Sequence, residues 1–348
     1  MPAAFPSGSN TFVKDHRATG GLIVDFSRNV SDFALNRYVQ IRTVDREAGY
    51  YLEMTVEEAG RIMNTDLRDF VWHDGQERPL RNEGTESFQF KEYRTQRYDY
   101  GFNLGDKAVN QAQWDIVGSH SRIKAQQAMT ARTQLAVTQL TTAGNYAAAH
   151  TSAVSSISGN TGNWGASTTQ RQDIKRSLNH AANTIIKATL GAVKETDLKL
   201  VIGPDTAIEM SECQEIVDHI KHSDLALAQV RGDQQFGNPN ARFGLPKKLY
   251  GFDVEIEDAV KTTSHKGATA AKSYVMGSGD AVMLARPGDL VAAAGGPSFS
   301  TIMLFAYEEM TVETLRDDRN RRQEGHVVDD IDLVMTAPAT GFYFTSAV

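Results

Sequence analysis

The chain has 348 residues, of which 41% are hydrophobic and 23% charged, and its formal net charge is -7. This is the composition of a soluble protein with enough apolar residues to build two lobes. The acidic balance argues against a protein whose task is to grip nucleic acid by its phosphates, although it is compatible with a wall that only encloses nucleic acid.

Two further classes of protein are disfavoured. The single cysteine, Cys213, rules out an internal disulfide and fits a reducing compartment. No apolar run approaches the ~18 residues of a membrane span, and the first residues lack the basic and apolar regions of a signal peptide. We therefore expect synthesis in the cytosol and no membrane partner.

The N-terminal third begins with an arm, residues 1–36, in which isolated apolar residues alternate with Ser, Gly and Asn. Such an arm is expected to be ordered only against its own protein or a neighbouring subunit. Residues 37–53 predict a strand, a turn at Glu47 to Gly49 and a returning strand. Residues 71–100 carry many charges of both signs and few apolar residues. This segment is either a projecting hairpin that pairs with a second copy of the chain or a solvated loop.

A long helix is predicted from Asp106 to Thr141, where Pro is absent and Gly118 is the one glycine. At about 1.5 Å per residue it would be roughly 54 Å long. A flexible loop with Trp164 as its anchor follows, and then an amphipathic helix over 168–190, which we expect to close a platform built on the long helix.

The next region, residues 199–296, has the pattern of an α/β lobe. A buried strand begins at Leu198, a helix starts near Pro204, and further strands follow. Because platform elements precede and follow this lobe, its two ends must lie close together.

The C-terminal segment predicts a long β-hairpin with a charged turn. Its first strand runs for about seventeen residues, which at about 3.3 Å each gives roughly 55 Å. In its second strand Val327, Ile331, Leu333 and Met335 share one face, while Asp330 and Asp332 take the other. We expect the long helix to lie along this hairpin, and an interpretation as an elongated tile depends on that pairing.

Catalytic motifs are weak in this sequence. There is no phosphate-binding Gly-rich loop, no H-E-x-x-H and no paired C-x-x-C. His219 and His222 beside Asp218 could serve as metal ligands but fit a solvated helix face better. A cation could also be collected by Asp317, Asp318, Asp329, Asp330 and Asp332. The neighbouring Arg316, Arg319, Arg321 and Arg322 favour ion pairing instead. We expect no enzyme activity and no cofactor.

The order of these parts resembles the major capsid protein of tailed double-stranded DNA phages, the Hong Kong 97-type capsid fold. The local motifs are Gly251 and Val254 in one strand, Gly279 and Asp280 before the next, and the long β segment from Phe299 to Arg322. One departure is Asp253, where the family often has Pro. The resemblance implies an α+β fold with five regions: an N-terminal arm (1–36), an extended loop with flanking strands (37–104), a peripheral domain with a spine helix (105–198), an inserted axial domain (199–296), and a return to the peripheral domain (297–348).

The resemblance also implies a function. The chain would self-assemble into hexamers and pentamers of an icosahedral shell in the virion, assembled in the host cytoplasm, and enclose DNA without sequence-specific binding. A portal and a decoration protein would be partners. The arm is too short to hold the scaffolding region of some members, so either a separate scaffold protein guides assembly or the chain is a processed form. An encapsulin-like compartment and a metal-dependent enzyme are the alternatives. The subunit contacts that we expect are Arg78, Arg81, Glu83, Glu86, Arg316, Asp317, Asp318 and Arg319.

Overall fold

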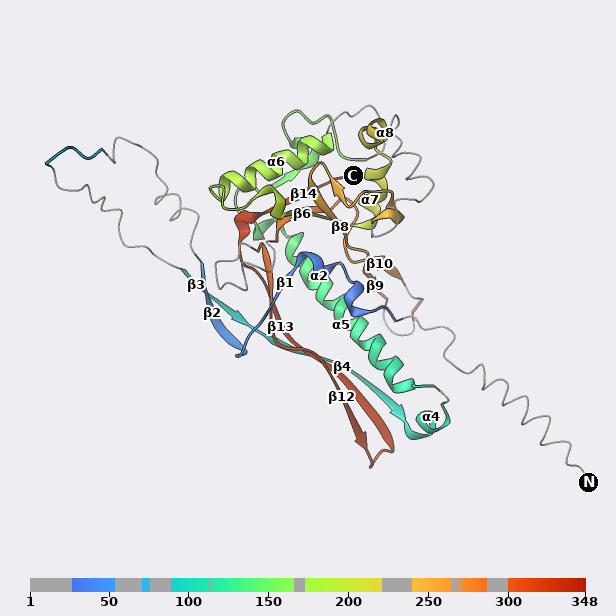
Figure 1. Cartoon of the computed structure of the whole chain (residues 1–348). Helices are drawn as coiled ribbons and strands as arrows, with labels where there is room; N and C mark the ends of the chain where they lie inside the picture. Colours follow the sequence, from blue (N-terminus) through green and yellow to red (C-terminus); the bar gives the residue numbers. More distant parts are fainter. Residues whose placement is uncertain are drawn as a thin grey trace, which may run out of the picture.

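The computed structural model describes residues 27–53, 71–75, 89–112, 114–165, 173–220, 240–264, 268–269, 271–286 and 300–348. Two lobes make up the molecule. One is an elongated platform of a four-stranded sheet and a long helix, and the other is built on a six-stranded sheet with helices on its outer face (Figure 1). The fold is therefore mixed α+β, as the sequence predicts.

The platform sheet is centred on the predicted hairpin. Its strand order is β1, β12, β13 and β4, with bounds Gln40–Thr43, Ile302–Asp317, Arg322–Met335 and Gln96–Gly105. β12 and β13 pair antiparallel from Ile302↔Met335 to Asp317↔Arg322. Sixteen residues in β12 give a strand of roughly 53 Å. The prediction of a long hairpin is confirmed.

The two halves of β12 have different surroundings. Residues 302–306 are buried, whereas the outer half is mostly exposed. Between them the register shifts at Ala306/Glu308 and Glu308/Thr311, and Met310 adopts a positive φ of 39°. Such bulges bend a strand and change its pairing. The outer half of the hairpin thus extends away from the core.

The predicted single helix from Asp106 to Thr141 is wrong at its N-terminal end. The structure has a short α4, Asp106–Gln111, and a separate 25-residue α5, Ile116–Leu140. Between them Ala112 is extended, and the Asp115 side chain accepts a hydrogen bond from the Gly118 amide at 2.8 Å. Aspartate favours this N-cap position over a helix interior, so a new helix begins here.

The longer piece still lies where the sequence places it. α5 runs along the hairpin and contacts β13 and β4 (Figure 1). At about 37 Å it is shorter than β12. Its buried residues recur at helical spacing and include Ala128, Met129, Ala136, Val137 and Leu140. Among the described helices none is both long and apolar enough to cross a membrane.

A second element covers the opposite face of the platform. β2 (Ala48–Glu53) pairs antiparallel with β3 (Gln89–Arg94), forming a two-stranded ribbon. The prediction that the two strands within 37–53 pair with each other is wrong, because β1 pairs in parallel with residues 303–306 of β12. The buried inner half of β12 offers β1 a more apolar neighbour than the exposed β2 does.

The other lobe has a sheet of strand order β5, β14, β11, β6, β8 and β7. Their bounds are Thr151–Ala153, Gly341–Thr345, Ala281–Ala285, Leu198–Ile202, Phe252–Ile256 and Lys248–Leu249. α6 (Asp173–Ala188), α7 (Pro204–Ser211) and α8 (Gln214–Ile220) pack on one face of this sheet. Pro204 is at the start of α7, as predicted. A small hairpin of β9 (Val260–Thr262) and β10 (Lys272–Tyr274) extends from the lobe.

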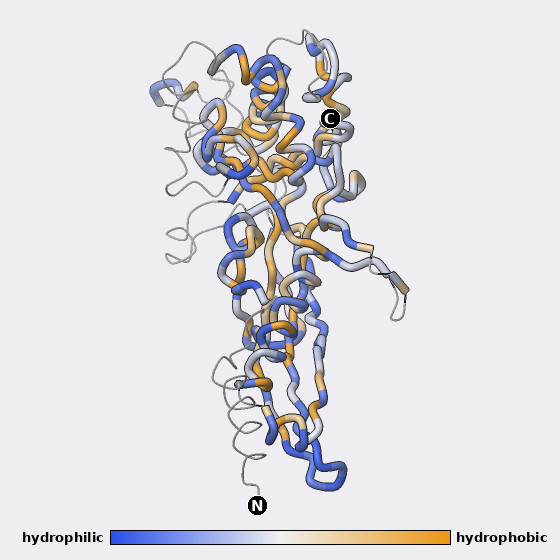
Figure 2. The backbone as a smooth tube through the Cα atoms, turned by 90° about the vertical axis from the view of Figure 1, so that its right-hand side faces the viewer, coloured by the Kyte–Doolittle hydropathy of each residue, from blue (hydrophilic) through white to orange (hydrophobic). Residues whose placement is uncertain are grey.

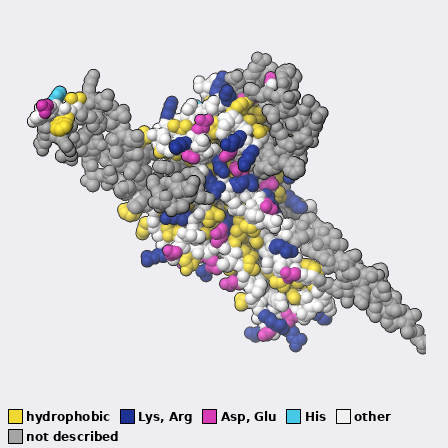
Figure 3. Space-filling view, viewed as in Figure 1, with side chains coloured by type: hydrophobic (Ala, Val, Ile, Leu, Met, Phe, Trp, Pro, Cys, Tyr) yellow, Lys and Arg dark blue, Asp and Glu magenta, His cyan; other side chains and the backbone are white. Residues whose placement is uncertain are grey.

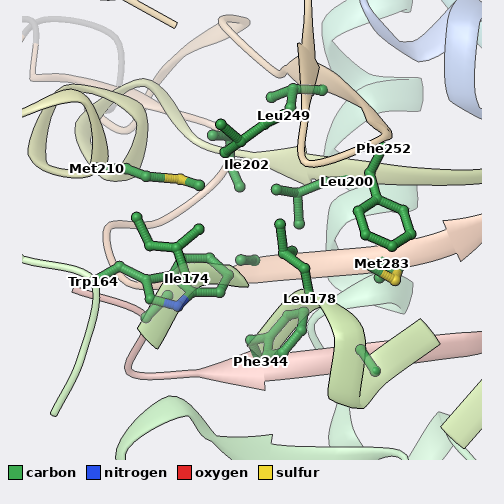
Figure 4. Packing of buried hydrophobic residues seen from close by; sticks show 14 of the residues in the cluster. Trp164, Ile174, Leu178, Leu200, Ile202, Met210, Leu249, Phe252, Met283 and Phe344 are labelled. Carbon is green, nitrogen blue, oxygen red and sulfur yellow. The ribbon is translucent and has the colours of Figure 1, made fainter. Parts of the chain in front are cut away.

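Strand alternation divides the apolar residues into two cores. Leu200 and Met283 face the helices, where they meet Ile174 and Leu178 of α6, and Phe344 of β14 belongs to the same cluster (Figure 4). Their neighbours in the same strands, among them Val201, Val282 and Leu284, face the other way. That second core continues into the platform through Leu140, Ile302 and Leu304. Hydrophobic segments accordingly run through the junction of the two lobes in Figure 2.

The positions of α6 and Trp164 can be compared with the predictions. The helix over 168–190 was expected to close the platform, but α6 packs on the six-stranded sheet, since its apolar stripe fits against β11 and β14. Trp164 is fully buried, as an anchor should be, although the stretch before it contains β5 and short 3-10 turns and is not a featureless loop. Of the predicted arm, residues 1–26 lie outside the described residues. The domain boundaries stay predictions.

The described end of the arm packs on its own protein. The 3-10 turn Val30–Asp32 is followed by α2 (Leu35–Tyr38), and Phe33, Leu35 and Tyr38 are buried in the second core. This part of the chain lies between the two lobes and contacts both.

Candidate subunit-contact surfaces

The turn of the long hairpin is held by one carboxylate. Asp317 accepts hydrogen bonds from the backbone amides of Arg319 (3.1 Å) and Asn320 (3.2 Å), and from the Asn320 side chain (2.6 Å). Arg322 Nε adds a fourth at 3.1 Å. The Asn320 side chain and these other donors lower the pKa of Asp317. Asp317 therefore shapes the turn.

The other charges of this turn point toward solvent. Arg316 reaches Asp318 at 2.8 Å and Asp106, the first residue of α4, at 3.4 Å. Within the described residues, Arg319 contributes only its backbone amide to this network, and its side chain makes no ion pair or hydrogen bond. Dark blue and magenta side chains accordingly gather at the lower end of the platform in Figure 3. The structure thus brings Arg316, Asp318 and Arg319 together on one exposed tip.

The predicted contacts in the charged segment cannot be placed. Arg78, Arg81, Glu83 and Glu86 lie outside the described residues. What the structure describes is the base of that segment, the β2–β3 ribbon. Whether either group contacts another subunit stays a prediction.

The ribbon has one docked face and one open face. Tyr51 and Tyr93 stack on Phe305 of β12, with ring centroids 5.8 and 4.6 Å away. The side chains of Tyr50 and Phe90 belong to the opposite face and are 72% and 71% exposed. Large exposed aromatic residues are typical of protein interfaces. The separation of these aromatic side chains into two faces depends on the pairing of β2 with β3, which the sequence does not indicate.

The outer half of β12 is a free sheet edge. β1 covers only residues 303–306, and no other described strand pairs with this edge of β12. Val312 and Leu315 on this half are 52% and 58% exposed. An unpaired edge with apolar side chains can accept another chain. The edge, the tip and the open face of the ribbon are therefore candidate contact surfaces.

One buried ion-pair network was missed by sequence reasoning. Arg132 of α5 donates to Asp329 of β13 with Nε at 2.6 Å and Nη2 at 2.5 Å, and its Nη1 is 3.3 Å from Glu309 of β12. Arg132 and Asp329 are almost fully buried. Desolvation by itself lowers the pKa of Arg132, but the hydrogen bonds and charges of Asp329 and Glu309 together outweigh it and raise that pKa. A signal was present, because Asp329 shares the parity of Val327 and Ile331, the buried face of the strand.

The acidic residues of the hairpin are dispersed. Ion pairing with the neighbouring arginines, which the sequence favours, is present for Asp317 with Arg322 and for Asp318 with Arg316, but among the described residues the other three have different partners. Asp329 faces α5, while Asp330 lies 3.6 Å from Arg97 and Asp332 accepts the Arg94 amide at 2.9 Å. Burial raises the pKa of Asp332. In the part of the chain that the structure describes, no group of three or more acidic, His or Cys residues could hold a metal ion.

The weak catalytic candidates gain little support. His222 and the side chain of His219 lie outside the described residues. The single cysteine, Cys213, is buried, and burial raises the pKa of its thiol, which disfavours the reactive thiolate.

The Gly279–Asp280 motif joins the end of the chain to the second lobe. Gly279 has a φ of +84°, its amide donates to Thr206 Oγ1 at 3.1 Å, and its carbonyl accepts the Ala347 amide at 2.7 Å. Asp280 accepts the Tyr343 hydroxyl at 2.6 Å. Burial and this bond raise the pKa of Tyr343 above its usual range. The motif thus fixes β14 beside β11.

Comparison with known proteins identifies the fold. No protein-family model matches the sequence, and no curated protein matches it. The chain is similar to a phage-related protein from Bordetella bronchiseptica (TM-score 0.59, 13% identity, 96% of each chain covered). It is also similar to the mature capsid of bacteriophage PhiM1 (0.52, 12%, covering 94% of this chain and 90% of that one) and the capsid of cyanophage P-SCSP1u (0.52, 10%, covering 94% and 90%). The chain therefore has a phage capsid fold, as its order of elements predicts.

Proposed function

We propose that this chain is a major capsid protein that assembles into hexamers and pentamers of an icosahedral shell enclosing double-stranded DNA. The observation that carries the proposal is the likeness to capsid structures over 94% of the chain, which includes both lobes. The exposed tip, sheet edge and ribbon are what a shell subunit needs at its margins. The work of such a protein is assembly and not catalysis.

Assembly follows from repetition of modest contacts. Each copy presents the same surfaces, so a contact between two different patches closes into a ring when the rotation permits. Individual contacts between exposed charges contribute little, about 0 to 1 kcal/mol each, but a ring repeats every contact. Weak single contacts also let misplaced subunits dissociate before the shell closes.

The roles of the expected contact residues can now be divided. We assign Asp317 to the shape of the turn and propose that the exposed Arg316, Asp318 and Arg319 face a neighbouring capsomer. Arg78, Arg81, Glu83 and Glu86 are proposed to contact the adjacent subunit of the same ring. A separate scaffold protein, a portal and a decoration protein remain proposed partners, and the virion is the proposed location after assembly in the host cytoplasm.

The test is a charge reversal at the tip, Arg316→Glu together with Arg319→Glu. We expect electron microscopy to show few complete particles, while circular dichroism and the unfolding midpoint stay unchanged. The matched control is Lys247→Glu with Lys272→Glu, two exposed lysines outside the platform. Normal particles from the tip variant would refute the tip contacts, and absence of particles from the unaltered chain would refute the shell.

The cargo is tested separately. Particles purified after nuclease treatment should contain DNA, measured by absorbance and by gel electrophoresis after disruption. Particles that instead contain a stoichiometric enzyme would indicate an encapsulin-like compartment. Metal analysis of the same particles tests the remaining alternative, a metal-dependent enzyme. A stoichiometric bound ion that is lost in the double variant His219→Ala with His222→Ala would favour that alternative.

A further inference from the structure

The outward face of α6 carries cations and amides but no carboxylate. Its buried face consists of Ile174, Ser177, Leu178, Ala181, Ala182 and Ile185. The opposite face places Lys175, Arg176, Asn179, His180 and Asn183 along a shallow hollow, which Ser158 and Ile157 complete from the neighbouring turn. Lys187 continues the same exposed row one turn further. None of the described residues that line this hollow is acidic, in a chain whose net charge is -7.

Two acidic residues at the start of α6 are already engaged in hydrogen bonds. Glu215 is buried and accepts the backbone amides of Ile174 (2.8 Å) and Lys175 (3.1 Å) at the start of α6. Asp173 is buried, accepts both the amide and the hydroxyl of Thr161, and lies 3.8 Å from Arg176. These carboxylates satisfy the helix start, so they leave most of the charge on the outward face uncompensated.

The spacing fits an extended anion and not a single small one. From Lys175 to Lys187 the row spans about 18 Å of helix. One DNA strand presents a phosphate about every 3.4 Å along the axis, so roughly five phosphates could lie against this row. Lys, Arg, Asn and Ser side chains are also the groups that commonly donate to phosphate oxygens.

We propose that the outward face of α6 binds the phosphate backbone of nucleic acid, without reading its sequence. The inference rests on the proposed function, in which the chain surrounds DNA, and it adds a specific wall contact to that function. The overall negative charge keeps the contact weak, because the surrounding surface repels the same polyanion. A weak contact suits DNA that must be packed and released.

The test uses the full chain below its assembly concentration and a fluorescent 20-base-pair duplex, with anisotropy measured from 50 to 200 mM salt. For the variant Lys175→Gln with Lys187→Gln, we expect about tenfold weaker binding per lysine at 50 mM salt and a salt slope smaller by about two. Both lysines are exposed, so the fold should persist, which circular dichroism checks.

The matched control is Lys248→Gln with Lys272→Gln, which removes the same charge from exposed positions outside α6. Equal weakening by both variants would mean diffuse attraction and would overturn the assignment. So would a lack of duplex binding by the unaltered chain, or equally tight, α6-dependent binding of polyglutamate, which would indicate an acidic protein partner. Normal particle formation by the α6 variant separates this inference from the proposed shell function.

Discussion

Arg132 of α5 and Asp329 of β13 form a two-pronged ion pair inside the platform, with distances of 2.6 and 2.5 Å. The pair fixes the helix against the hairpin at the level where β12 leaves the core. Asp329→Ala would leave the guanidinium buried with only the partly exposed Glu309 as a partner. We expect a loss of about 3 to 5 kcal/mol in the free energy of unfolding, measured by urea denaturation.

A variant that removes both charges distinguishes pairing from packing. Arg132→Met with Asp329→Leu should recover most of the stability, because an apolar pair can replace a buried ion pair at little cost. If the double variant is as unstable as Asp329→Ala, the shape of the pair matters more than the uncompensated charge.

Glu257 gives the protein a specific pH dependence. Its carboxylate is buried, accepts the Tyr38 hydroxyl at 2.9 Å and the Ala259 amide at 3.2 Å, and burial raises its pKa to about 7. Between pH 4.5 and 7 the folded state keeps this proton while the unfolded state releases it. The stabilisation is therefore complete at low pH and is lost as pH rises through 7, by roughly 3 kcal/mol.

The comparison variant for this group is Glu257→Gln, which stays neutral at every pH. We expect the difference in unfolding free energy between the two proteins to change by roughly 3 kcal/mol between about pH 4.5 and about pH 8. The measurement is urea denaturation at several pH values. Parallel pH profiles for the two proteins would contradict a buried, proton-retaining Glu257.

The long hairpin of the platform is predictable from the sequence because its alternation pattern lies within each strand. The apolar parity along β13 is visible in Val327, Ile331 and Leu333, and all three are buried in the structure, although Asp330 of the opposite parity is buried too. Asp115 and Gly118 also carry an N-cap signal, which a helix drawn through both residues ignores. Partner choice over long range is different, since nothing in residues 40–43 indicates that β1 pairs with β12.

The same distinction applies to the candidate contacts. The tip of the hairpin is readable, because two strands must be joined by a turn and its residues are charged. The location of α6 cannot be predicted from the sequence. Its apolar stripe indicates that one face is buried but does not indicate against which sheet. That Tyr50 and Phe90 share one exposed face follows only from the pairing of β2 with β3. This pairing joins residues about forty positions apart in the sequence, so local patterns do not predict it.

Trp164 should be the most stabilising single side chain of the second lobe. It is fully buried, lies 5.2 Å from the Phe344 ring and donates to Ser177 Oγ at 3.3 Å. Trp164→Ala should lose about 3 to 5 kcal/mol, and Trp164→Phe clearly less. Tyr50→Ala is the control, since that side chain is 72% exposed and surface changes stay within about 0.5 kcal/mol.

Gly325 tests the packing of the outer hairpin. It faces Phe102 of β4, and a Cβ at this position would overlap the Phe102 ring. The ring also contacts His120 of α5, at 5.6 Å between centroids, so it cannot move toward the helix without displacing it. Gly325→Ala should therefore destabilise the protein by about 1 to 3 kcal/mol in urea denaturation.

Two variants make this last expectation specific to the ring. Gly105→Ala changes a glycine of the same sheet where a Cβ meets no atom within 4 Å, so its effect should be small. The double variant Gly325→Ala with Phe102→Leu should have an unfolding free energy close to that of Phe102→Leu alone. The two single effects should not add, because the smaller side chain makes room for the methyl group. If the two effects are strictly additive, the cost of Gly325→Ala arises from the backbone and not from the Phe102 ring. The contact of that ring with Gly325 and His120 would then not be what holds β4, β13 and α5 together.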